Sequence, residues 1–243
     1  MVLPAFEEGL RVADSIARVR AELADLDAAG DLQVVVVDDG SSDDTAAKAR
    51  EAGADLVIVN PRNRGKGGAV KAGVTGSTGA TVAFTDIDLA YAPGQIAELL
   101  RRVEAGAPVV VGSRWLPTTT TGTGSANPSL GRAVASRLFN VATFASVGVW
   151  RDTQCGLKAF DRAVASQLFD RVSLDGFSFD VEIFLAARAA GISVTDVPVT
   201  LDEAAGTTVR LAGQVRAVRD LIRLRRKMRR GDYTPGGAGR PAG

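Results

Sequence analysis

Histidine is missing from this chain of 243 residues, and cysteine, tryptophan and tyrosine are scarce. Without histidine, the imidazole bases of Ser-His-Asp hydrolases and the histidine ligands of most catalytic zinc sites are excluded. The single cysteine, Cys155, excludes an intrachain disulfide and favours a reducing, cytoplasmic setting. Its neighbours in the sequence favour a small packing residue over an activated nucleophile.

A large net charge and long apolar runs are also lacking. Lysine and arginine number 29 against 28 aspartate and glutamate residues, so no overall electric field favours a nucleic-acid partner. No stretch approaches the length of a membrane span, and the N-terminus does not have the pattern of a signal peptide. We therefore expect a soluble intracellular protein with enough chain for one large α/β domain or two small ones.

Two pairs of carboxylates follow short apolar runs. Asp38 and Asp39 come directly after four valines, and Asp86 and Asp88 come after a Thr-Val-Ala-Phe-Thr run. The carboxyl ends of parallel strands share the sheet edge where ligands bind, so we expect these carboxylates to lie close together. Their mutual repulsion would be relieved by a divalent metal with a nucleoside diphosphate. Either pair alone would be explained equally well as the end of a strand and the cap of a helix.

Strand-like and helix-like segments alternate through the first half, which predicts an α/β fold with a mostly parallel sheet. Glycines fall where the helices should end. The expected strands are 2–3, 33–37, 56–59, 81–84 and 109–111, and the expected helices are 8–28, 43–52, 66–77, 93–105 and 131–149. The Thr-, Gly- and Ser-rich segment 116–130 predicts a loop, either a lid over the site or a solvated linker.

Several motifs resemble family 2 glycosyltransferases of the GT-A fold: Leu3–Glu8, Val37–Thr45 and Asp86-Ile87-Asp88. Within that family, the chain is similar to the dolichyl-phosphate glucosyltransferase branch and, next, to dolichyl-phosphate mannose synthases, through Asn63–Val70, Gly112–Arg114, Asp152–Lys158 and Phe179–Glu182. The resemblance implies a Rossmann-like sheet flanked by helices in one domain, residues 1–233. Residues 1–112 would form the nucleotide-sugar half and 113–233 the acceptor half, before a disordered tail over 234–243.

The same resemblance implies an inverting, metal-dependent enzyme that moves a hexose from a nucleoside-diphosphate sugar to a polyprenyl phosphate. UDP-glucose is the first candidate for the donor and GDP-mannose the second. Asp86 and Asp88 would hold Mg²⁺ or Mn²⁺ and contribute to catalysis; Ala90 stands where mannose synthases often place glutamine, so a third side-chain ligand is missing. The donor would contact Pro4, Phe6, Glu8, Asp38, Asp39 and Lys66, although the glycine-rich turn at Lys66 would be explained equally well by close packing.

The acceptor phosphate has three candidate partners: Arg114, Arg132 and Arg210. Arg210 lies near Thr207-Thr208, which stands where the family has a Ser-Lys pair. Asp152 would orient the acceptor or the sugar, because a phosphate monoester with a second pKa of about 6 needs little help from a base. Asp180 and Glu182 are explained at this level as charges in the first turn of a helix.

The segment 213–230 combines eight basic residues with apolar residues at helical spacing: Val215, Val218, Leu221, Ile222 and Leu224. Such a basic amphipathic helix is predicted to lie on anionic lipid and to make the enzyme peripheral at the cytoplasmic membrane face. A solvated helix face would fit the same composition. Two other functions stay open, namely a glycosyltransferase with a small soluble acceptor and a non-catalytic sugar-nucleotide-binding or membrane-associated scaffold. A nucleotidyltransferase is disfavoured because the segment after the first strand is acidic rather than glycine-rich and basic.

Overall fold

The computed structural model describes residues 1–116, 120–121, 143, 148, 151–201 and 212–233. The predicted loop over 116–130, the predicted helix over 131–149, Arg132, Thr207-Thr208, Arg210 and the tail 234–243 fall wholly or almost wholly outside the described residues.

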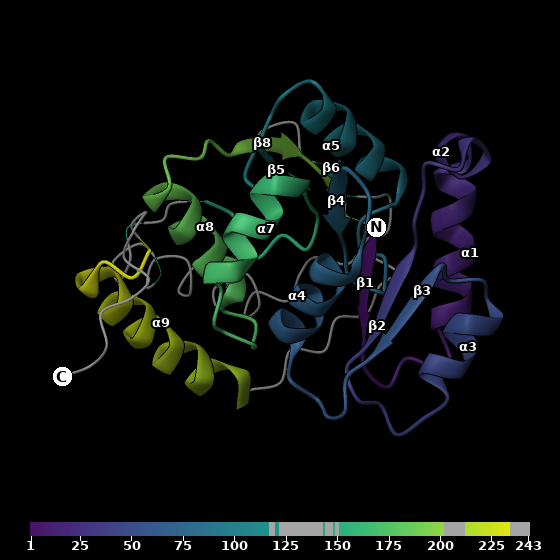
Figure 1. Ribbon diagram of the computed structural model, residues 1–243, viewed down its shortest axis with the longest axis horizontal. Helices are drawn as coiled ribbons and strands as arrows, with labels where there is room; N and C mark the ends of the chain where they lie inside the picture. The colour runs from purple at the N-terminus through teal and green to yellow at the C-terminus, as the bar shows by residue number, and fades with distance from the viewer. Residues whose placement is uncertain (117–119, 122–142, 144–147, 149–150, 202–211, 234–243) are drawn as a thin grey trace.

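A seven-stranded sheet in the order β3-β2-β1-β4-β7-β5-β8 forms the middle layer of the fold (Figure 1). Strand β7 runs antiparallel to both of its neighbours, and the other pairs are parallel, which confirms the predicted mostly parallel sheet. Its strands are β1 (Val2–Ala5), β2 (Val35–Asp38), β3 (Leu56–Val59), β4 (Thr81–Phe84), β5 (Val109–Ser113), β7 (Lys158–Asp161) and β8 (Thr195–Pro198). A separate parallel pair consists of β6 (Thr120–Thr121) and β9 (Thr200–Leu201).

Helices cover both faces of the sheet, and alternate strand residues face each side. Val35 and Val37 pack with α4, α7, α8 and α9, whereas Val34 and Val36 pack with α1, α3 and α5. Burial on both faces explains why β2 is an unbroken apolar run. The helices are α1 (Val12–Glu22), α2 (Ala24–Ala29), α3 (Thr45–Glu51), α4 (Lys66–Gly76), α5 (Gly94–Glu104), α7 (Arg162–Arg171), α8 (Phe179–Ala189) and α9 (Ala212–Arg230).

The first predicted helix, 8–28, is wrong in its extent. It begins only at Val12, because the preceding backbone bonds the loop after β2: the N–H of Glu8 donates to Thr45 Oγ1 and that of Gly9 to Asp43 Oδ2. It also breaks at Leu23, whose φ of −114° and ψ of 31° leave the helical region. Leu23 is buried in the same apolar cluster as Val19, so packing outweighs the continuous helical pattern.

The sheet delivers several loops to one edge. The carboxyl ends of the parallel strands β1, β2, β4 and β5 meet there, and the antiparallel β7 begins there, with Lys158 paired to Phe84 and Val111. The segment just before β7, which contains Asp152, therefore arrives at the same edge as the loop that carries Asp86 and Asp88. This is the ligand-binding edge of an open α/β sheet.

Helix α9 packs on the core through its apolar residues. Leu221 and Leu224 are buried, and Ile222 is 48% exposed. Leu221 and Leu224 therefore face the protein core, so these two side chains are not available for a contact with lipid. The side chains of Val215 and Val218 lie outside the described part. Within the described residues, no helix has the length and apolarity to cross a membrane.

A fully buried carboxylate fixes the end of α9. Both oxygens of Glu182 accept hydrogen bonds: Lys227 Nζ lies 2.5 Å and Tyr233 Oη 2.8 Å from Oε1, while the N–H groups of Ser173 and Leu174 donate to Oε2 at 2.9 and 2.8 Å. Burial by itself would raise the pKa of Glu182, but Lys227 and Tyr233 outweigh burial and hold this pKa below its usual value. Glu182 is therefore a structural cross-link, not merely a first-turn charge.

Replacing Glu182 by glutamine is expected to lower the free energy of unfolding at pH 7 by about 3 kcal/mol, because Lys227 loses its buried partner. The pKa of Glu182 is depressed in the folded state, so its stabilisation is present above the unfolded-state pKa and disappears as pH falls through the folded-state pKa. Urea unfolding at pH 7 and at acidic pH measures both effects. Glu98→Gln, which removes a carboxylate near the surface, is the control. If the difference in unfolding free energy between Glu182→Gln and the wild type did not decrease at acidic pH, an ionised Glu182 would not be the stabilising group.

Candidate active site

The loops after β1 and β2 are tied together by side chain–backbone hydrogen bonds. Glu7 has a left-handed φ of 57°, and its Oε1 accepts from both the N–H and the Oγ of Ser42, at 2.8 and 2.9 Å. Ala5 at the end of β1 pairs with Asp38, and Phe6, which is 45% exposed, directly follows Ala5. The structure thus brings together the predicted donor contacts Pro4, Phe6, Glu8 and Asp38.

Asp39 is engaged within the protein. Its carboxylate accepts from Asn60 Nδ2 at 2.7 Å and from the backbone N–H groups of Gly65 at 2.7 Å and Arg64 at 3.1 Å. The side chain is buried at the start of the glycine-rich turn. Asp39 therefore shapes the loop that leads into α4, whereas the carboxylate of Asp38 accepts only a local bond from Ser41 N–H among the bonds that the structure describes.

Lys66, the first residue of α4, contacts a candidate metal ligand directly. Its Nζ lies 2.6 Å from Asp86 Oδ1, and the side chain is only 13% exposed. Burial disfavours the charged amine, but Asp86 and Asp180 outweigh it and raise the pKa of Lys66, so the amine carries a charge at neutral pH. Both sequence interpretations of this turn, a phosphate contact and close packing, missed the ion pair, because nothing in the sequence links residues 66 and 86.

Asp88 is the less neutralised carboxylate of the pair. Burial and the neighbouring charge of Asp86 raise its pKa, and a hydrogen bond of 3.2 Å from Ala90 N–H opposes that shift. The next residue, Leu89, has a left-handed φ of 48°, a strained conformation that is common beside functional groups. Two adjacent carboxylates balanced by one lysine leave negative charge at this edge.

The donor set of Asp86 and Asp88 fits a hard divalent cation. Among the described residues, no group of three or more acidic or cysteine side chains is arranged to hold a metal. Two carboxylates are sufficient for Mg²⁺ or Mn²⁺ when substrate phosphates supply further oxygen ligands. The pair is therefore suited to a metal that arrives with a diphosphate rather than to a metal bound by protein ligands alone.

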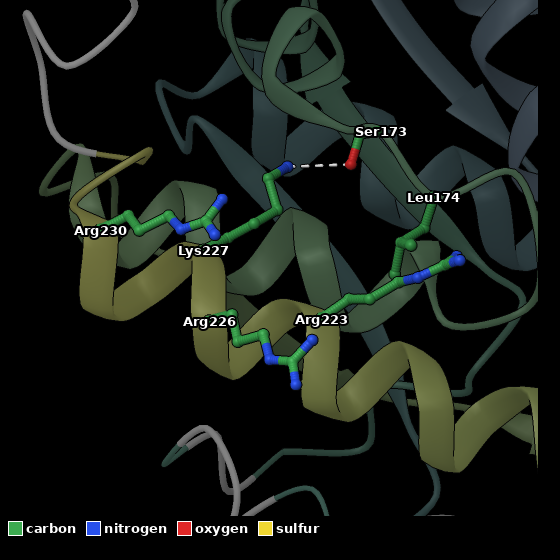
Figure 2. Close-up of a pocket in the computed structure, with 6 residues that line it drawn as sticks. All are labelled: Ser173, Leu174, Arg223, Arg226, Lys227 and Arg230. Atoms are coloured by element: carbon green, nitrogen blue, oxygen red, sulfur yellow. Dashed lines mark hydrogen bonds between the residues drawn. The ribbon is translucent and has the colours of Figure 1, made fainter. Parts of the chain in front are cut away.

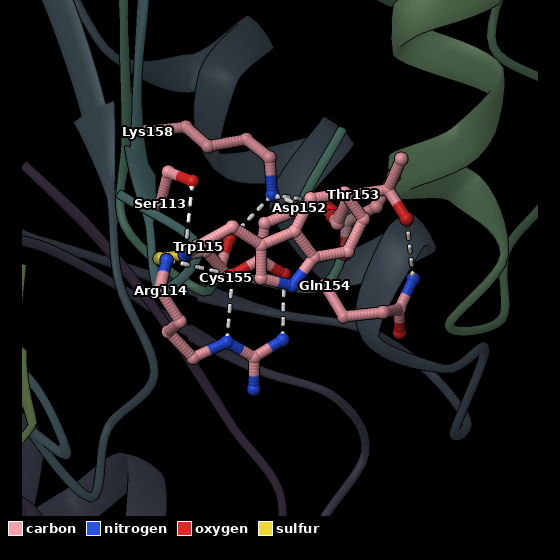
Figure 3. A network of polar contacts seen from close by, with 9 residues as sticks. Ser113, Arg114, Trp115, Asp152, Thr153, Gln154, Cys155 and Lys158 are labelled. Carbon is pink, nitrogen blue, oxygen red and sulfur yellow. Dashed lines mark hydrogen bonds and ion pairs between the residues drawn. The ribbon is translucent and has the colours of Figure 1, made fainter. Parts of the chain in front are cut away.

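Arg114 and Asp152 form a bidentate ion pair at the end of β5 (Figure 3). Nε and Nη2 of Arg114 lie 2.7 and 2.6 Å from the two oxygens of Asp152, and the backbone N–H of Arg114 adds a bond of 2.9 Å. Asp152 is buried and Arg114 is 33% exposed; burial disfavours the guanidinium, but Asp152 outweighs it and raises the pKa of Arg114. The remaining guanidinium nitrogen points away from Asp152, so the arginine is oriented and still has a donor group to offer.

A buried ion pair that sequence reasoning did not predict lies at the start of β7. Lys158 is fully buried and lies 2.6 Å from Asp180, which is also buried at the start of α8. The only indication of this pair in the sequence was a lysine inside the apolar run Leu-Lys-Ala-Phe. The same lysine interrupts the apolar pattern, so strand β7 was not predicted. Cys155 is fully buried and burial raises the pKa of its thiol, which confirms a packing role.

A mostly parallel sheet with an Asp-X-Asp turn at its carboxyl edge is the arrangement of a GT-A glycosyltransferase. The solved structures agree: glucosyl-3-phosphoglycerate synthase from Mycobacterium tuberculosis in complex with UDP matches with a TM-score of 0.66 at 20% identity, over 96% of this chain and 79% of that one. The same enzyme in complex with Mn²⁺, UDP-glucose and glycerol 3-phosphate gives a TM-score of 0.65 at 19% identity, with the same coverage. At this identity the likeness shows the fold.

The family follows from the sequence comparison. The model described as glycosyl transferase family 2 matches residues 1–167, and the chain belongs to that family. Among curated relatives, a dolichyl-phosphate beta-glucosyltransferase of Trichomonas vaginalis is 29% identical, over 96% of this chain and 72% of its own length. The mouse dolichyl-phosphate beta-glucosyltransferase is 32% identical over 72% of this chain and 57% of its own length. Glycosyltransferase AglD of Haloferax volcanii is 31% identical over 91% of this chain, which spans only 35% of that relative.

Proposed function

We propose that this family 2 glycosyltransferase moves glucose, with inversion, from UDP-glucose to a polyprenyl phosphate of the dolichyl-phosphate type. The single observation that carries the proposal is the pairing of opposite charges at one sheet edge. Asp86 and Asp88 lie on one side, suited to a metal-bound diphosphate, and the oriented cation Arg114 lies on the other, suited to a second phosphate. Two of the named relatives are dolichyl-phosphate beta-glucosyltransferases, which supports the choice of substrates.

Donor binding is assigned to the nucleotide-sugar half, residues 1–112. Phe6 and Glu8 offer an exposed ring and a carboxylate for the base and ribose, beside Pro4 and the buried carboxylate of Asp38, which accepts a bond from Ser41 N–H. Asp39 contributes by holding the loop that precedes α4. Lys66 sits at the amino end of α4, where its charge and the helix dipole both favour phosphate.

Asp86 and Asp88 would hold Mg²⁺ or Mn²⁺ in this assignment. When bound, the metal neutralises the charge that develops on the departing diphosphate. Lys66 already neutralises part of the charge of Asp86 and lies within reach of the same region. Lys66 and Arg114 would thus face different phosphates, one on the donor and one on the acceptor.

The reaction needs a nucleophile rather than a strong base. An oxygen of the acceptor phosphate attacks C1 of glucose, a new C1–O bond forms, and the bond from C1 to the diphosphate oxygen breaks, so UDP leaves with the electron pair. The acceptor phosphate is already largely ionised near neutral pH, since its second pKa is about 6. This suits a site whose carboxylate Asp152 is committed to Arg114 through both oxygens. Asp152 is therefore assigned to orientation, and no proton needs to be removed.

A panel of radiolabelled sugar nucleotides with a short polyprenyl phosphate tests the proposal. We expect transfer from UDP-glucose in the presence of Mg²⁺ or Mn²⁺, a weaker reaction with GDP-mannose, and no reaction in excess chelator. Efficient transfer to a small phosphate compound, with none to the lipid, would instead favour the soluble-acceptor alternative, because Arg114 would bind the phosphate of either acceptor. Binding of UDP-glucose with neither transfer nor hydrolysis would leave only the scaffold function.

We also propose that α9 brings the enzyme to the surface of anionic lipid. Its outer face carries six exposed arginines: Arg219, Arg223, Arg225, Arg226, Arg229 and Arg230. Among the described residues, the one carboxylate paired with this group is Asp220, 3.7 Å from Arg223. A cavity of about 340 Å³ opens between the helix and the 173–174 backbone, and Arg223, Arg226, Lys227 and Arg230 line it (Figure 2). With Leu221 and Leu224 buried, the attraction to lipid would be mainly electrostatic.

Replacing Arg223, Arg226 and Arg230 together by glutamine is expected to weaken binding to phosphatidylglycerol vesicles between about tenfold and a hundredfold at low salt, because each surface cation contributes about 1 kcal/mol before screening. Cosedimentation at low and high salt measures the loss. The control replaces Arg18 on α1 and Arg101 and Arg102 on α5 by glutamine, which changes the net charge by the same amount. Truncation of α9 is unsuitable because it would also remove Lys227 and Tyr233 from Glu182. If both triple variants lost the same amount of vesicle binding, the loss would be due to the change in net charge and not to α9.

A further inference from the structure

The buried amine of Lys158 binds the loop between Asp152 and β7 at two points. Its Nζ donates to the carbonyl oxygens of Cys155 at 2.6 Å and Thr153 at 3.2 Å (Figure 3). It also donates to Asp180 Oδ1 at 2.6 Å. A lysine ammonium has three N–H donors, so these bonds use all of them. Lys158 thereby fastens the backbone of the loop to the first turn of α8.

The two ends of this loop touch the two candidate phosphate-binding groups. Asp152, at the start, holds Arg114 through both carboxylate oxygens. Gly156, near the end, lies so close to Asp86 that a Cβ at this position would stand 2.4 Å from Asp86 Oδ2 and 3.8 Å from Lys66 Nζ. The loop thus connects Arg114 directly to the candidate metal-binding carboxylates. A side chain at position 156 would displace Asp86.

The Lys158–Asp180 ion pair lies in an apolar environment, where the cost of burying two charges makes it a poor way to stabilise the fold. Lys158 is fully buried, with its Nζ 5.3 Å from the centre of the Phe84 ring and 6.0 Å from that of Phe184. Burial raises the pKa of Asp180, and Lys158 opposes that shift. Apolar residues of similar volume usually stabilise such a site at least as well as a buried ion pair does. What an apolar pair cannot provide is a donor for the carbonyls of Thr153 and Cys155.

We propose that Lys158 and Asp180 are positioning residues for glycosyl transfer, which set the separation of Arg114 from Asp86 by fixing the loop between them. Lys158 acts through the loop backbone, whereas Asp180 holds Lys158 and also places negative charge near Lys66. The proposal rests on the function proposed above for Arg114, Asp86 and Asp88. It predicts that loss of the lysine slows the transfer step more than it weakens the binding of the donor, because the separation of the two sites changes while each site persists.

The test compares Lys158→Met with the matched variant Arg162→Met. Arg162 follows the other end of β7 and also binds backbone carbonyls, of Gly79 and Val74, but at the opposite edge of the sheet. The double variant Lys158→Met/Asp180→Leu removes the uncompensated buried carboxylate and is expected to regain most of the thermal stability that Lys158→Met loses. Thermal unfolding, kcat, KM for both substrates, and hydrogen exchange of the 152–157 amides are measured on all three.

We expect kcat to fall at least tenfold in Lys158→Met and to stay low in the double variant, with the KM for UDP-glucose changed less than threefold. Exchange of the 152–157 amides should be faster in both, and Arg162→Met should lose stability without either effect. Recovery of kcat together with stability in the double variant would overturn the proposal, since the pair would then only stabilise the fold. If the wild-type enzyme transferred glucose to no acceptor, the proposed function would be wrong. The hydrogen exchange rates would still show whether Lys158 orders the loop.

Discussion

Replacing Asp88 by asparagine is expected to reduce glucose transfer by at least about a hundredfold while the fold is retained. The substitution nearly preserves volume but removes one of the two carboxylates proposed to hold the metal, and such a contact is commonly worth several kcal/mol of activation free energy. The expected loss falls on kcat/KM for the donor, measured at saturating acceptor over a range of Mn²⁺ concentrations. Asp88 is suited to this role because Lys66 neutralises mainly Asp86.

The fold of the Asp88→Asn variant should be unchanged or slightly more stable. Burial and Asp86 raise the pKa of Asp88, so its ionised form is disfavoured in the folded state and its loss relieves repulsion. Thermal unfolding without metal checks this, with Glu98→Gln on the exposed face of α5 as a control for loss of a carboxylate outside the site. Near-normal turnover of Asp88→Asn, or full wild-type activity in excess chelator, would show that transfer does not depend on a metal held by Asp88.

Removing the Arg114–Asp152 pair should impair use of the acceptor selectively. Arg114→Ala alone leaves Asp152 buried without a partner, which would destabilise the protein and confuse the kinetics. The double variant Arg114→Ala/Asp152→Asn avoids that difficulty. We expect its kcat/KM for polyprenyl phosphate to fall at least about thirtyfold, because truncating one partner of a hydrogen-bonded charge contact costs about 2 kcal/mol or more, while calorimetric affinity for UDP-glucose changes less than about threefold.

Two companion variants sharpen the result. Arg114→Lys keeps the charge but not the planar fork that Asp152 holds, so an intermediate loss is expected. Arg151→Ala/Asp196→Asn removes a neighbouring Arg–Asp pair, 2.5 Å apart and about one third exposed on each side, and should change neither substrate. Equal losses for donor and acceptor in the Arg114 variant would assign the arginine to the donor site or to the scaffold.

The repeating strand and helix pattern predicted most of the sheet correctly. The run 81–84 coincides with β4, whose residues are mostly buried, and 56–59 with β3, an edge strand that is apolar although only partly buried. Strand β7 escaped prediction because it begins with Lys158, whose charge is satisfied by Asp180, far away in the sequence. A buried charge looks like a surface residue until its partner is known.

At the site, the sequence located the acidic groups but not their contacts. It predicted Asp38, Asp39, Asp86 and Asp88 at one edge, since strand order along the chain implies that their carboxyl ends coincide. It assigned Asp38 and Asp39 to the donor and Asp86 and Asp88 to a metal, but it did not predict that Asp39 binds backbone N–H groups, that Asp86 binds Lys66, or that burial and Asp86 raise the pKa of Asp88. Hydrogen bonds between loops depend on where those loops meet, and local patterns do not specify that.

The sequence by itself determined the alternation of strands and helices, the acidic sheet edge and the basic character of residues 213–230, because these follow from short-range periodicity and composition. Only the tertiary structure decided that Leu221 and Leu224 face the core instead of lipid, and that one buried lysine connects Arg114 to Asp86 through a loop. The physical reason is the same in both cases. Which partner a side chain satisfies depends on the elements packed against it, and those come from distant parts of the chain.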